Sequence, residues 1–403
     1  MTTLTIVIPA YNEENGIATI VNRVLAVKES LKKAHVDELE LLVVNDGSRD
    51  RTCEIAQGLA QQDPCVNVIS HPKNRGYGAA LKTGFAKAKG ELVGFLDADG
   101  TYPPEYFPQL CEAALAGSDI VIGSRMMGAD SKMPLTRRIG NVFFASLLTL
   151  IGAQRVTDSA SGMRVFKKSV LERIFPLPDG LNLTPVMSTR AVHENLKIVE
   201  IPIPYSERVG RSKLSVIHDG RIFLESMIWT AMSYNPVRIF GLVGLAFLLL
   251  AGLVVAGLVT ARLSGVTTLG PWGVAALYSA LVNAVIGISL FAIGAAFNYL
   301  VSLFYKTPIR QGLFGKPILK TPIEVYFGWG GLATFLLGTL TAVVTLALGL
   351  NGWEITRLWL YLLGSAMMVL VGVQLMINWF LMRVLGELSH RSAAAEQDLN
   401  PVL

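Results

Sequence analysis

The pattern of hydrophobic positions divides the chain into two parts. Residues before about Tyr234 alternate short apolar runs with mixed segments, as soluble α/β proteins do. Four long apolar runs follow, and each exceeds the roughly 20 residues with which an α-helix crosses a hydrocarbon core. They lie at 239–261, 272–304, 327–350 and 358–382. We therefore expect a globular N-terminal domain followed by a transmembrane domain of four helices, and not the buried helices of a large soluble core.

Within the first part, strand-like and helix-like patterns alternate. Short apolar runs typical of buried strands lie at 4–9, 39–45, 66–70, 92–96 and 120–123. Helical patterns lie between them at 15–30, 51–62, 76–89 and 104–116. Such alternation predicts a parallel, doubly wound, Rossmann-like α/β sheet. In these sheets ligands bind outside the carboxyl ends of the strands.

These patterns also predict the domain boundaries. We expect a catalytic domain at 1–212, juxtamembrane interfacial helices at 213–236, the four-helix transmembrane domain at 237–385 and a tail at 386–403. Residues 1–9 have no basic segment and no long apolar core, so they predict a strand and not a signal peptide.

Charge predicts the orientation in the membrane. The net charge of +5 arises partly from basic residues in two segments, one between the second and third runs and one after the fourth. These residues are Lys306, Arg310, Lys316, Lys320, Arg383 and Arg391, whereas the opposite loops have only Arg262 and Arg357 at their margins. Positive loops face the cytoplasm. We therefore expect a multi-pass protein of the plasma (inner) membrane with the catalytic domain and both termini cytoplasmic, and no nucleic-acid partner.

Polar residues follow three of the predicted strands. Because these strand ends meet at one rim of a parallel sheet, we expect one ligand site there. Two carboxylates two residues apart suit Mg²⁺ or Mn²⁺ beside substrate phosphates. We assign Asp97 and Asp99 to the metal, and expect Asp46 to bind a base or ribose and Tyr11 to stack on the base. The candidate residues at the ends of the three strands are Pro9, Tyr11, Asn12, Glu13, Asp46, Gly47, Asp97 and Asp99.

A basic pair precedes an apolar segment that is too short to span a membrane. Arg137 and Arg138 stand before residues 142–152, and arginine is well suited to planar phosphate recognition. This pattern predicts a headgroup site beside a helix that lies in the membrane interface, and residues 214–231 form a second interfacial candidate. The alternatives are an ordinary core helix, a linker to the membrane domain and a solvated basic rim.

Several motifs taken together resemble the inverting GT-A glycosyltransferases of family 2. They are Val-Ile-Pro-Ala-Tyr-Asn-Glu-Glu at 7–14, Val-Asn-Asp-Gly-Ser at 44–48, Asn-Arg-Gly-Tyr-Gly at 74–78, Asp-Ala-Asp at 97–99, Gly-Ser-Arg at 123–125, Asp-Ser-Ala-Ser-Gly-Met at 158–163 and Glu-Arg-Val-Gly-Arg-Ser-Lys-Leu at 207–214. Within the family, the chain is similar to the polyprenyl-phosphate branch, typified by dolichol-phosphate mannose synthase. The resemblance covers about residues 3–235.

The resemblance implies roles for individual residues. It places the nucleotide sugar against Pro9, Tyr11, Asn12, Glu13, Asp46, Gly47, Asp97 and Lys213, and the acceptor phosphate against Arg125, Arg137, Arg138, Asn141 and Ser212. It makes Asp97, Asp99 and Arg125 catalytic. Ser212 and Lys213 belong to a loop that moves over the site. This chain has Thr101 where many relatives have a glutamine metal ligand, so water or Thr101 replaces that ligand here and mannose is less strongly implied.

The expected reaction transfers a hexose, with inversion, from a donor of the GDP-mannose or UDP-glucose type to a dolichyl or undecaprenyl phosphate. The cofactor is Mg²⁺ or Mn²⁺, and the partners are the nucleotide diphosphate sugar, the lipid phosphate and the membrane; a homo-oligomer is also compatible. Three alternatives stay open. The first is a polysaccharide synthase, although the Gln-x-x-Arg-Trp motif of these enzymes is absent. The second is a glycolipid synthase with a hydroxyl acceptor, and the third is a sugar-lipid flippase with a nucleotide-sugar-binding domain. The spans contain almost no charge, which argues against transport.

Overall fold

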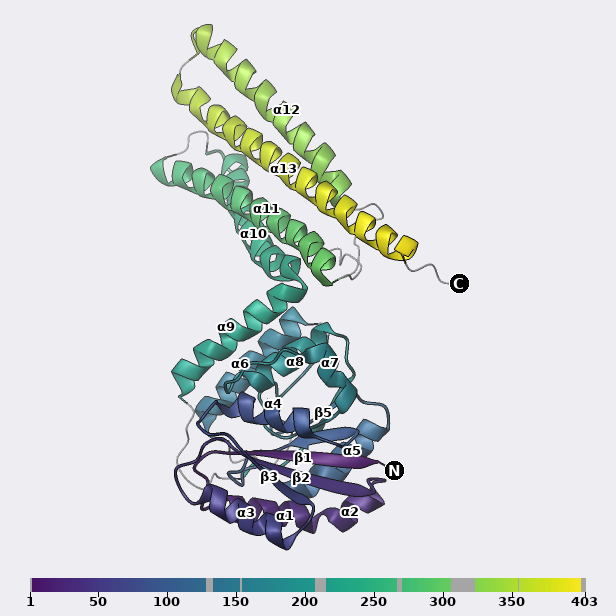
Figure 1. Ribbon diagram of the computed structural model, residues 1–403. Helices are drawn as coiled ribbons and strands as arrows, with labels where there is room; N and C mark the ends of the chain where they lie inside the picture. Colours follow the sequence, from purple (N-terminus) through teal and green to yellow (C-terminus); the bar gives the residue numbers. More distant parts are fainter. Residues whose placement is uncertain are drawn as a thin grey trace. The chain divides into compact units, whose positions relative to one another are not determined.

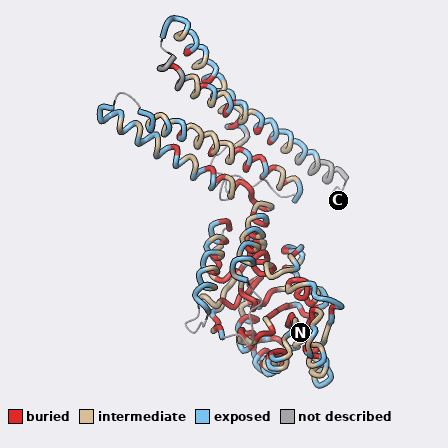
Figure 2. The backbone as a smooth tube through the Cα atoms, turned by 90° about the vertical axis from the view of Figure 1, so that its left-hand side faces the viewer, coloured by how far each residue is buried: buried red, intermediate tan, exposed pale blue. Residues whose placement is uncertain are grey.

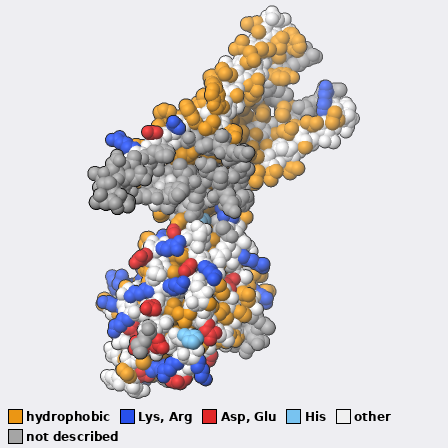
Figure 3. Space-filling model, turned by 90° about the vertical axis from the view of Figure 1, so that its right-hand side faces the viewer, with side chains coloured by type: hydrophobic (Ala, Val, Ile, Leu, Met, Phe, Trp, Pro, Cys, Tyr) orange, Lys and Arg blue, Asp and Glu red, His pale blue; other side chains and the backbone are white. Residues whose placement is uncertain are grey.

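The computed structural model of the protein describes residues 2–127, 133–152, 154–206, 215–266, 270–305, 323–353 and 355–399. The chain forms two compact units, Met1–Ala231 and Met232–Leu403 (Figure 1). The first unit has a hydrophobic interior with charged residues outside, whereas the helices of the second unit expose most of their apolar side chains (Figures 2 and 3). The surface of the first unit therefore suits water, whereas the surface of the second unit suits an apolar environment.

A seven-stranded sheet forms the centre of the first unit. The strand order is β3-β2-β1-β4-β6-β5-β7, and the pairs β1–β2, β1–β4, β2–β3 and β5–β7 are parallel. This arrangement confirms the Rossmann-like sheet and all five predicted strands. The strands are β1 (Thr3–Ala10), β2 (Glu38–Asn45), β3 (Val66–Ser70), β4 (Leu92–Phe95), β5 (Ile120–Ser124), β6 (Arg164–Lys167) and β7 (Ile198–Pro202).

The sheet is mixed and not wholly parallel, so that part of the expectation is wrong. Strand β6 lies between β4 and β5 and runs antiparallel to both. It is only four residues long, and its Arg-Val-Phe-Lys sequence begins and ends with charged residues, so it lacks the apolar run by which the other strands are recognised. Antiparallel strands on an otherwise parallel sheet are common in large α/β folds.

Helices cover both faces of the sheet. Alternate residues of β1 point to opposite faces: Leu4, Ile6 and Ile8 pack with α1, α2, α3 and α5, and Val7 packs with α4, α6, α7 and α8. Helix α9 also packs Met227 on the second face. The helices are α1 (Ile17–Ala26), α2 (Lys28–Lys33), α3 (Thr52–Gln62), α4 (Tyr77–Lys87), η1 (Pro104–Tyr106), α5 (Phe107–Leu115), α6 (Leu135–Ile151), η2 (Lys168–Val170), α7 (Leu171–Ile174), α8 (Leu183–His193) and α9 (Val216–Tyr234).

The second unit contains four helices that are long and apolar enough to cross a membrane. Their apolar cores agree with the four runs expected from the sequence. They are α10 (Pro236–Leu263), α11 (Pro271–Tyr305), α12 (Ile323–Leu350) and α13 (Ile355–Leu399). Helices α10 and α11 pack as one hairpin, α12 and α13 pack as another, and α11 contacts α13 (Figure 1).

Glycines set the close approach of the helices within each hairpin. A Cβ atom added at Gly244 would lie 2.6 Å from the carbonyl oxygen of Gly287, and one added at Gly331 would lie 3.0 Å from the carbonyl oxygen of Gly372. Small residues allow such backbone contact between membrane helices. The hairpins are joined by a hydrogen bond of 2.8 Å from the Ser289 hydroxyl to Oε1 of Gln374.

Candidate active site

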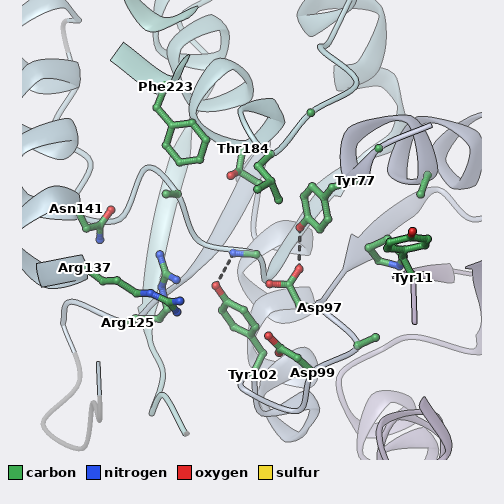
Figure 4. Close-up of a pocket in the computed structure, with 18 of the residues that line it drawn as sticks. Tyr11, Tyr77, Asp97, Asp99, Tyr102, Arg125, Arg137, Asn141, Thr184 and Phe223 are labelled. Atoms are coloured by element: carbon green, nitrogen blue, oxygen red, sulfur yellow. Dashed lines mark hydrogen bonds between the residues drawn. The ribbon is translucent and has the colours of Figure 1, made fainter. Parts of the chain in front are cut away.

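A cavity of about 580 Å³ lies in the first unit at the carboxyl ends of the strands. The loops after β1, β2, β4 and β5 and the helices α6 and α9 contribute to its wall. Figure 4 shows Asp97 and Asp99 in its middle, with Tyr11 on one side and Arg137 and Asn141 on the other. Of the residues singled out from the sequence, those that line the cavity are Pro9, Tyr11, Glu13, Asp46, Asp97, Asp99, Arg125, Arg137 and Asn141.

Three other sequence-predicted residues lie outside this lining. Arg138 is exposed on α6. The backbone N–H of Asn12 donates to the Ser48 hydroxyl at 3.0 Å, which ties the loop after β1 to the loop after β2. Gly47 has a positive φ of 68°, and a Cβ atom there would lie 2.5 Å from the backbone of Lys73. Asn12 and Gly47 thus hold the backbone of the loops after β1 and β2, whereas Ser212 and Lys213 lie outside the described residues.

Neighbouring hydroxyl groups orient the two carboxylates between β4 and α5. The Tyr77 hydroxyl donates to Oδ1 of Asp97 at 2.8 Å, and the Thr101 hydroxyl donates to Oδ1 of Asp99 at 2.6 Å. Burial, together with the charge of Asp97, raises the pKa of Tyr77 well above its usual value, so this phenol stays a donor. No cluster of three or more His, Cys, Asp or Glu side chains suited to a metal occurs in the part of the chain that the structure describes. Two oriented carboxylates fit a hard cation that takes its other ligands from phosphate and water.

Asp46 is held by three hydrogen bonds from the protein. Its Oδ1 accepts from Nδ1 of His71 at 2.7 Å and from the N–H of Arg75 at 2.9 Å, and its Oδ2 accepts from the N–H of Gly76 at 2.8 Å. The other ring nitrogen of His71 lies 2.9 Å from the Thr83 hydroxyl. Because both Asp46 and His71 are buried, this pair fixes the floor of the cavity between β2 and α4.

Arg125 is paired with the buried carboxylate of Asp158. Its Nε donates to Oδ2 and its Nη2 donates to Oδ1, both at 2.7 Å, and the rings of Tyr102 and Tyr205 lie 5.7 and 5.4 Å from the guanidinium carbon. Burial disfavours both charges, but their mutual attraction and these hydrogen bonds outweigh it. The pKa of Arg125 is therefore raised and that of Asp158 is lowered. Two of the donors of Arg125 are thus committed within the protein.

A fully buried arginine supports the loop beside Asp97. Nε of Arg164 donates to the carbonyl oxygen of Ser161 at 3.1 Å and Nη2 donates to that of Ser159 at 2.7 Å. Burial lowers the pKa of Arg164 to about 10, so it is charged at neutral pH. The loop brings Gly162 so close to Asp97 that a Cβ atom there would lie 2.6 Å from Oδ2. Only glycine fits this position without moving the carboxylate.

Helices α6 and α9 give one end of the cavity an apolar wall. Phe144 of α6 and Phe223 of α9 both line it, with their ring centroids 5.8 Å apart. Away from the cavity, α6 exposes Leu135, Ile139 and Phe143, whose relative exposures are 71%, 61% and 52%. The helix therefore buries one face in the first unit and leaves an apolar face outside, as an interfacial helix would.

Comparison with known proteins shows the family of this chain. Residues 5–175 match the family described as glycosyl transferase family 2. The chain is 30% identical over 325 residues to the undecaprenyl-phosphate 4-deoxy-4-formamido-L-arabinose transferase of Pseudomonas paraeruginosa, an alignment that covers 79% of this chain and 90% of the relative. The chain belongs to glycosyl transferase family 2. The expected glycosyltransferase class is thereby confirmed.

Other similarities concern parts of this family 2 chain. The dolichyl-phosphate hexose transferase of Haloferax volcanii is 30% identical over 225 residues, which cover 56% of this chain and 92% of the relative. A solved mannosyltransferase of Pyrobaculum calidifontis, in complex with GDP-Man and Mn²⁺, is 17% identical, with a TM-score of 0.39 and coverage of 92% of this chain and 86% of that one. Residues 236–396 match a domain of unknown function, DUF8752.

Several residues of the site received no role from the sequence. Tyr77, Asp158 and Gly162 belong to motifs that were recognised, at 74–78 and 158–163, but the motifs did not show that these residues orient Asp97 and Arg125. Tyr205 and His71 gave no signal, because single aromatic or imidazole side chains are common in a core. Their contribution depends on contacts between distant segments.

Proposed function

We propose that this family 2 glycosyltransferase moves a hexose from a nucleotide diphosphate sugar to a polyprenyl phosphate, with inversion at the anomeric carbon. The observation that carries the proposal is the arrangement of groups in one cavity: Tyr11 lies on one side, the carboxylates Asp97 and Asp99 lie in the middle and Arg137 lies on the other side (Figure 4), and the lining also includes the apolar rings of Phe144 and Phe223. This arrangement matches a base, a diphosphate, an anionic acceptor and its lipid. The printed names of relatives, which act on undecaprenyl and dolichyl phosphates, support the same acceptor class.

The donor half of the cavity would bind the nucleotide. Tyr11 offers a ring for stacking on the base, and Asp46, whose carboxylate is already fixed by its three hydrogen bonds, presents its remaining lone pair to a base or ribose N–H or O–H. Mg²⁺ or Mn²⁺ held by Asp97 and Asp99 would neutralise charge on the leaving diphosphate. Both carboxylates are oriented in advance by Tyr77 and Thr101, which lowers the cost of reorganisation during the reaction.

The acceptor half needs no strong general base. A phosphomonoester has its second pKa near about 6, so the attacking oxygen is already ionised at neutral pH. The tasks left to the protein are to hold this oxygen in line with the anomeric carbon and to balance its charge. Arg137 lines the cavity and would supply the positive charge that balances the phosphate. The Arg125–Asp158 ion pair stabilises the neighbouring part of the cavity wall.

The membrane domain and the exposed apolar face of α6 support a lipid surface as the location of this chemistry. We assign the catalytic unit and both termini to the cytoplasmic side of the plasma membrane, because basic residues gather in the segment between α11 and α12 and near the end of α13. Nucleotide sugars are then available from the cytoplasm, and the lipid phosphate arrives at the interface beside α6.

The test is a product assay with the purified full-length protein in detergent. We expect a radiolabelled sugar from UDP-glucose or GDP-mannose to appear on a short polyprenyl phosphate, and not on the corresponding polyprenol. The product should be absent with chelator and restored by Mn²⁺ or Mg²⁺. Asp99→Ala should abolish turnover while the circular dichroism spectrum stays unchanged. Transfer to a hydroxyl lipid alone would show that the acceptor class is wrong, and full activity of Asp99→Ala in chelator would show that the metal assignment is wrong.

A further inference from the structure

The carboxylate of Asp158 lies behind the wall of the cavity and is completely buried. Its Oδ2 accepts from the backbone N–H of Arg125 at 3.0 Å and from Nε of the same residue at 2.7 Å. Its Oδ1 accepts from Nη2 of Arg125 at 2.7 Å and from Nδ2 of Asn141 at 3.0 Å, so the amide nitrogen of Asn141 faces Asp158. Each oxygen thus accepts two hydrogen bonds, which fills its lone pairs. Asp158 has no acceptor left for a substrate, and its influence on the reaction must pass through Arg125 or Asn141.

Both the position and the charge of Asp158 are fixed by the protein. Oε1 of Glu200, in β7, accepts from the backbone N–H of Asp158 at 2.8 Å and anchors it. Burial disfavours the charge of Asp158, but the attraction of Arg125 and the hydrogen bonds outweigh burial and lower the pKa of this carboxyl, so it is ionised at neutral pH. The positive charge of Arg125 is therefore offset by a negative charge in direct contact with it.

This pairing leaves one end of the Arg125 guanidinium uncommitted. Nε and Nη2 each donate to Asp158, whereas Nη1 has no hydrogen-bond partner among the described residues and is not one of the buried unpaired atoms. Nη1 is therefore accessible, and Arg125 is part of the cavity lining. Figure 4 shows Arg125 on the same side of Asp97 as Arg137 and opposite Tyr11. The uncommitted end of Arg125 thus offers N–H donors to an anion on the acceptor side of the cavity.

An arginine whose charge is offset suits an anionic nucleophile. In the proposed reaction an oxygen of the acceptor phosphate forms a bond to the anomeric carbon, and the nucleoside diphosphate leaves with the electron pair of the broken bond. The attacking phosphate loses negative charge in this step. An additional net positive charge beside it would stabilise the bound phosphate more than the transition state, which strengthens binding and slows the reaction. Arg125 paired with Asp158 offers directed donors without adding net charge.

We propose that Asp158 is a positioning residue that sets both the direction and the charge of the acceptor-phosphate site. It directs Nη1 of Arg125 toward the phosphate, and it cancels the charge that Arg125 would otherwise add. Through Asn141 it also connects Arg125 to α6, on which Arg137 lies one turn earlier. This inference rests on the proposed function of the cavity.

The test uses Asp158→Asn, which removes the negative charge and nearly keeps the shape. The full-length protein is assayed in detergent with whichever of UDP-glucose and GDP-mannose it uses and with varied short-chain polyprenyl phosphate. Acceptor KM should fall roughly threefold or more, because the site gains one positive charge. The kcat should fall roughly 10- to 100-fold, because Arg125 is no longer directed and the bound phosphate is stabilised too strongly. Donor KM should stay near that of the native protein.

Opposite effects on acceptor binding and turnover separate this role from a structural one. Loss of support for the fold would lower kcat and raise acceptor KM, and either that result or unchanged kinetics would overturn the inference. A change confined to donor KM would overturn it too and would assign Arg125 to the diphosphate. Asp63→Asn is the matched control, since Asp63 pairs with Lys28 at 2.7 Å outside the cavity lining. It should leave both constants unchanged.

A neutral pair keeps the inference testable if circular dichroism shows that Asp158→Asn does not fold. Arg125→Gln combined with Asp158→Asn removes both charges, so the net charge of the site equals that of the native protein. Acceptor KM should then stay within about threefold of the native value, whereas kcat should fall because the directed guanidinium is lost. An acceptor KM raised roughly tenfold or more would overturn the inference, because it would show that the charge of Arg125 is not offset.

Formation of no lipid-linked sugar by the native protein would instead contradict the proposed function itself. A native protein that makes the product, with an Asp158→Asn variant whose acceptor KM is raised, would contradict only the role of Asp158. The two failures are therefore distinguishable in one set of assays.

Discussion

At the scale of single residues, Arg137 and Arg138 are neighbours with the same charge in different surroundings. Arg137 lines the cavity, whereas Arg138 is exposed on α6 and does not line it. If Arg137 holds the acceptor phosphate, Arg137→Ala removes charge-assisted hydrogen bonds worth about 1.5–3 kcal/mol each. Acceptor kcat/KM should fall roughly 10- to 100-fold, with little change in donor binding.

Steady-state kinetics with varied acceptor and a direct donor-binding measurement check this prediction. Arg138→Ala is the matched control and should change acceptor kcat/KM by less than about threefold, since an exposed charge contributes little. Arg137→Lys should rescue only partly, because lysine keeps the charge but loses the planar fork. Weakened nucleotide-sugar binding with an unchanged acceptor KM would assign Arg137 to the donor instead.

Gly162 offers a second prediction at this scale. In Gly162→Ala the new methyl group would lie 2.6 Å from Oδ2 of Asp97, and the carboxylate would have to leave the position set by Tyr77. The proposed metal should then bind more weakly, so that more Mn²⁺ is needed for half-maximal activity and kcat falls. A titration of activity with Mn²⁺ measures both effects.

The control for this variant is a glycine in open space. Gly58 lies inside α3, no heavy atom lies within 4 Å of an added Cβ atom, and it does not line the cavity. Gly58→Ala should raise the free energy of unfolding by about 0.5–1 kcal/mol and leave the Mn²⁺ titration unchanged. An unchanged titration in Gly162→Ala would show that Asp97 does not need its present position.

Single residues also show how far the sequence could predict the site. Asp97, Asp99 and Arg137 were found because acidic residues at strand ends and arginines before an apolar helix have recognisable patterns. The orientation of Asn141 was not predictable, because it depends on Asp158, which lies in a separate segment and is itself oriented by Arg125. Sequence patterns indicate which residue types converge, whereas hydrogen-bond direction is a property of the folded contacts.

At the scale of secondary-structure elements, α6 has two faces with different surroundings. It buries Ala145 and Leu148 in the first unit and exposes Val142 and Phe143, which are 49% and 52% accessible. We predict that this outer face rests in the membrane interface. Phe143→Asn should lower activity about tenfold or more on a long-chain polyprenyl phosphate in vesicles, since removing a buried aromatic ring costs about 1.5–3 kcal/mol.

Activity on a short-chain acceptor in detergent should stay near that of the native protein. Leu115→Asn is the matched control, because Leu115 is an exposed leucine, 42% accessible, at the end of α5 and outside the cavity. It should have no effect in either assay. Equal losses in vesicles and detergent for Phe143→Asn would indicate that Phe143 supports the fold and not the interface.

The elements themselves were predictable where one pattern dominated. Strands β1 to β5 consist mostly of apolar residues, and their ends agree with the expected ranges within one or two residues. Strand β7 mixes Glu200 with apolar residues, and β6 is short and bounded by charges, so neither showed the apolar run of a buried strand. The direction of β6 depends on long-range pairing with β4 and β5, which a local pattern does not encode.

At the scale of the whole molecule, the prediction concerns topology: if each of the four candidate membrane helices crosses once, the chain returns to the side on which it entered. We predict that a reporter fused after Leu403 is cytoplasmic, on the same side as a reporter at the N-terminus. A reporter in the loop between α10 and α11 should be on the opposite side. Alkaline phosphatase and fluorescent-protein fusions measure this, and an external signal after Leu403 would contradict both the topology and the use of cytoplasmic donors.

The glycine contacts of the second unit have a consequence for its symmetry. The sequence Phe-Gly-x-x-Gly-Leu-Ala begins at Phe240 in α10 and again at Phe327 in α12, and the second glycine of each motif meets a glycine of its partner helix. Ser289 and Gln374 each lie two residues after that partner glycine, and they hydrogen-bond to each other. Equivalent positions of the two hairpins thus meet, as in an isologous dimer. The two hairpins thus repeat one motif and touch through corresponding positions, so a substitution at either Ser289 or Gln374 acts on the same contact.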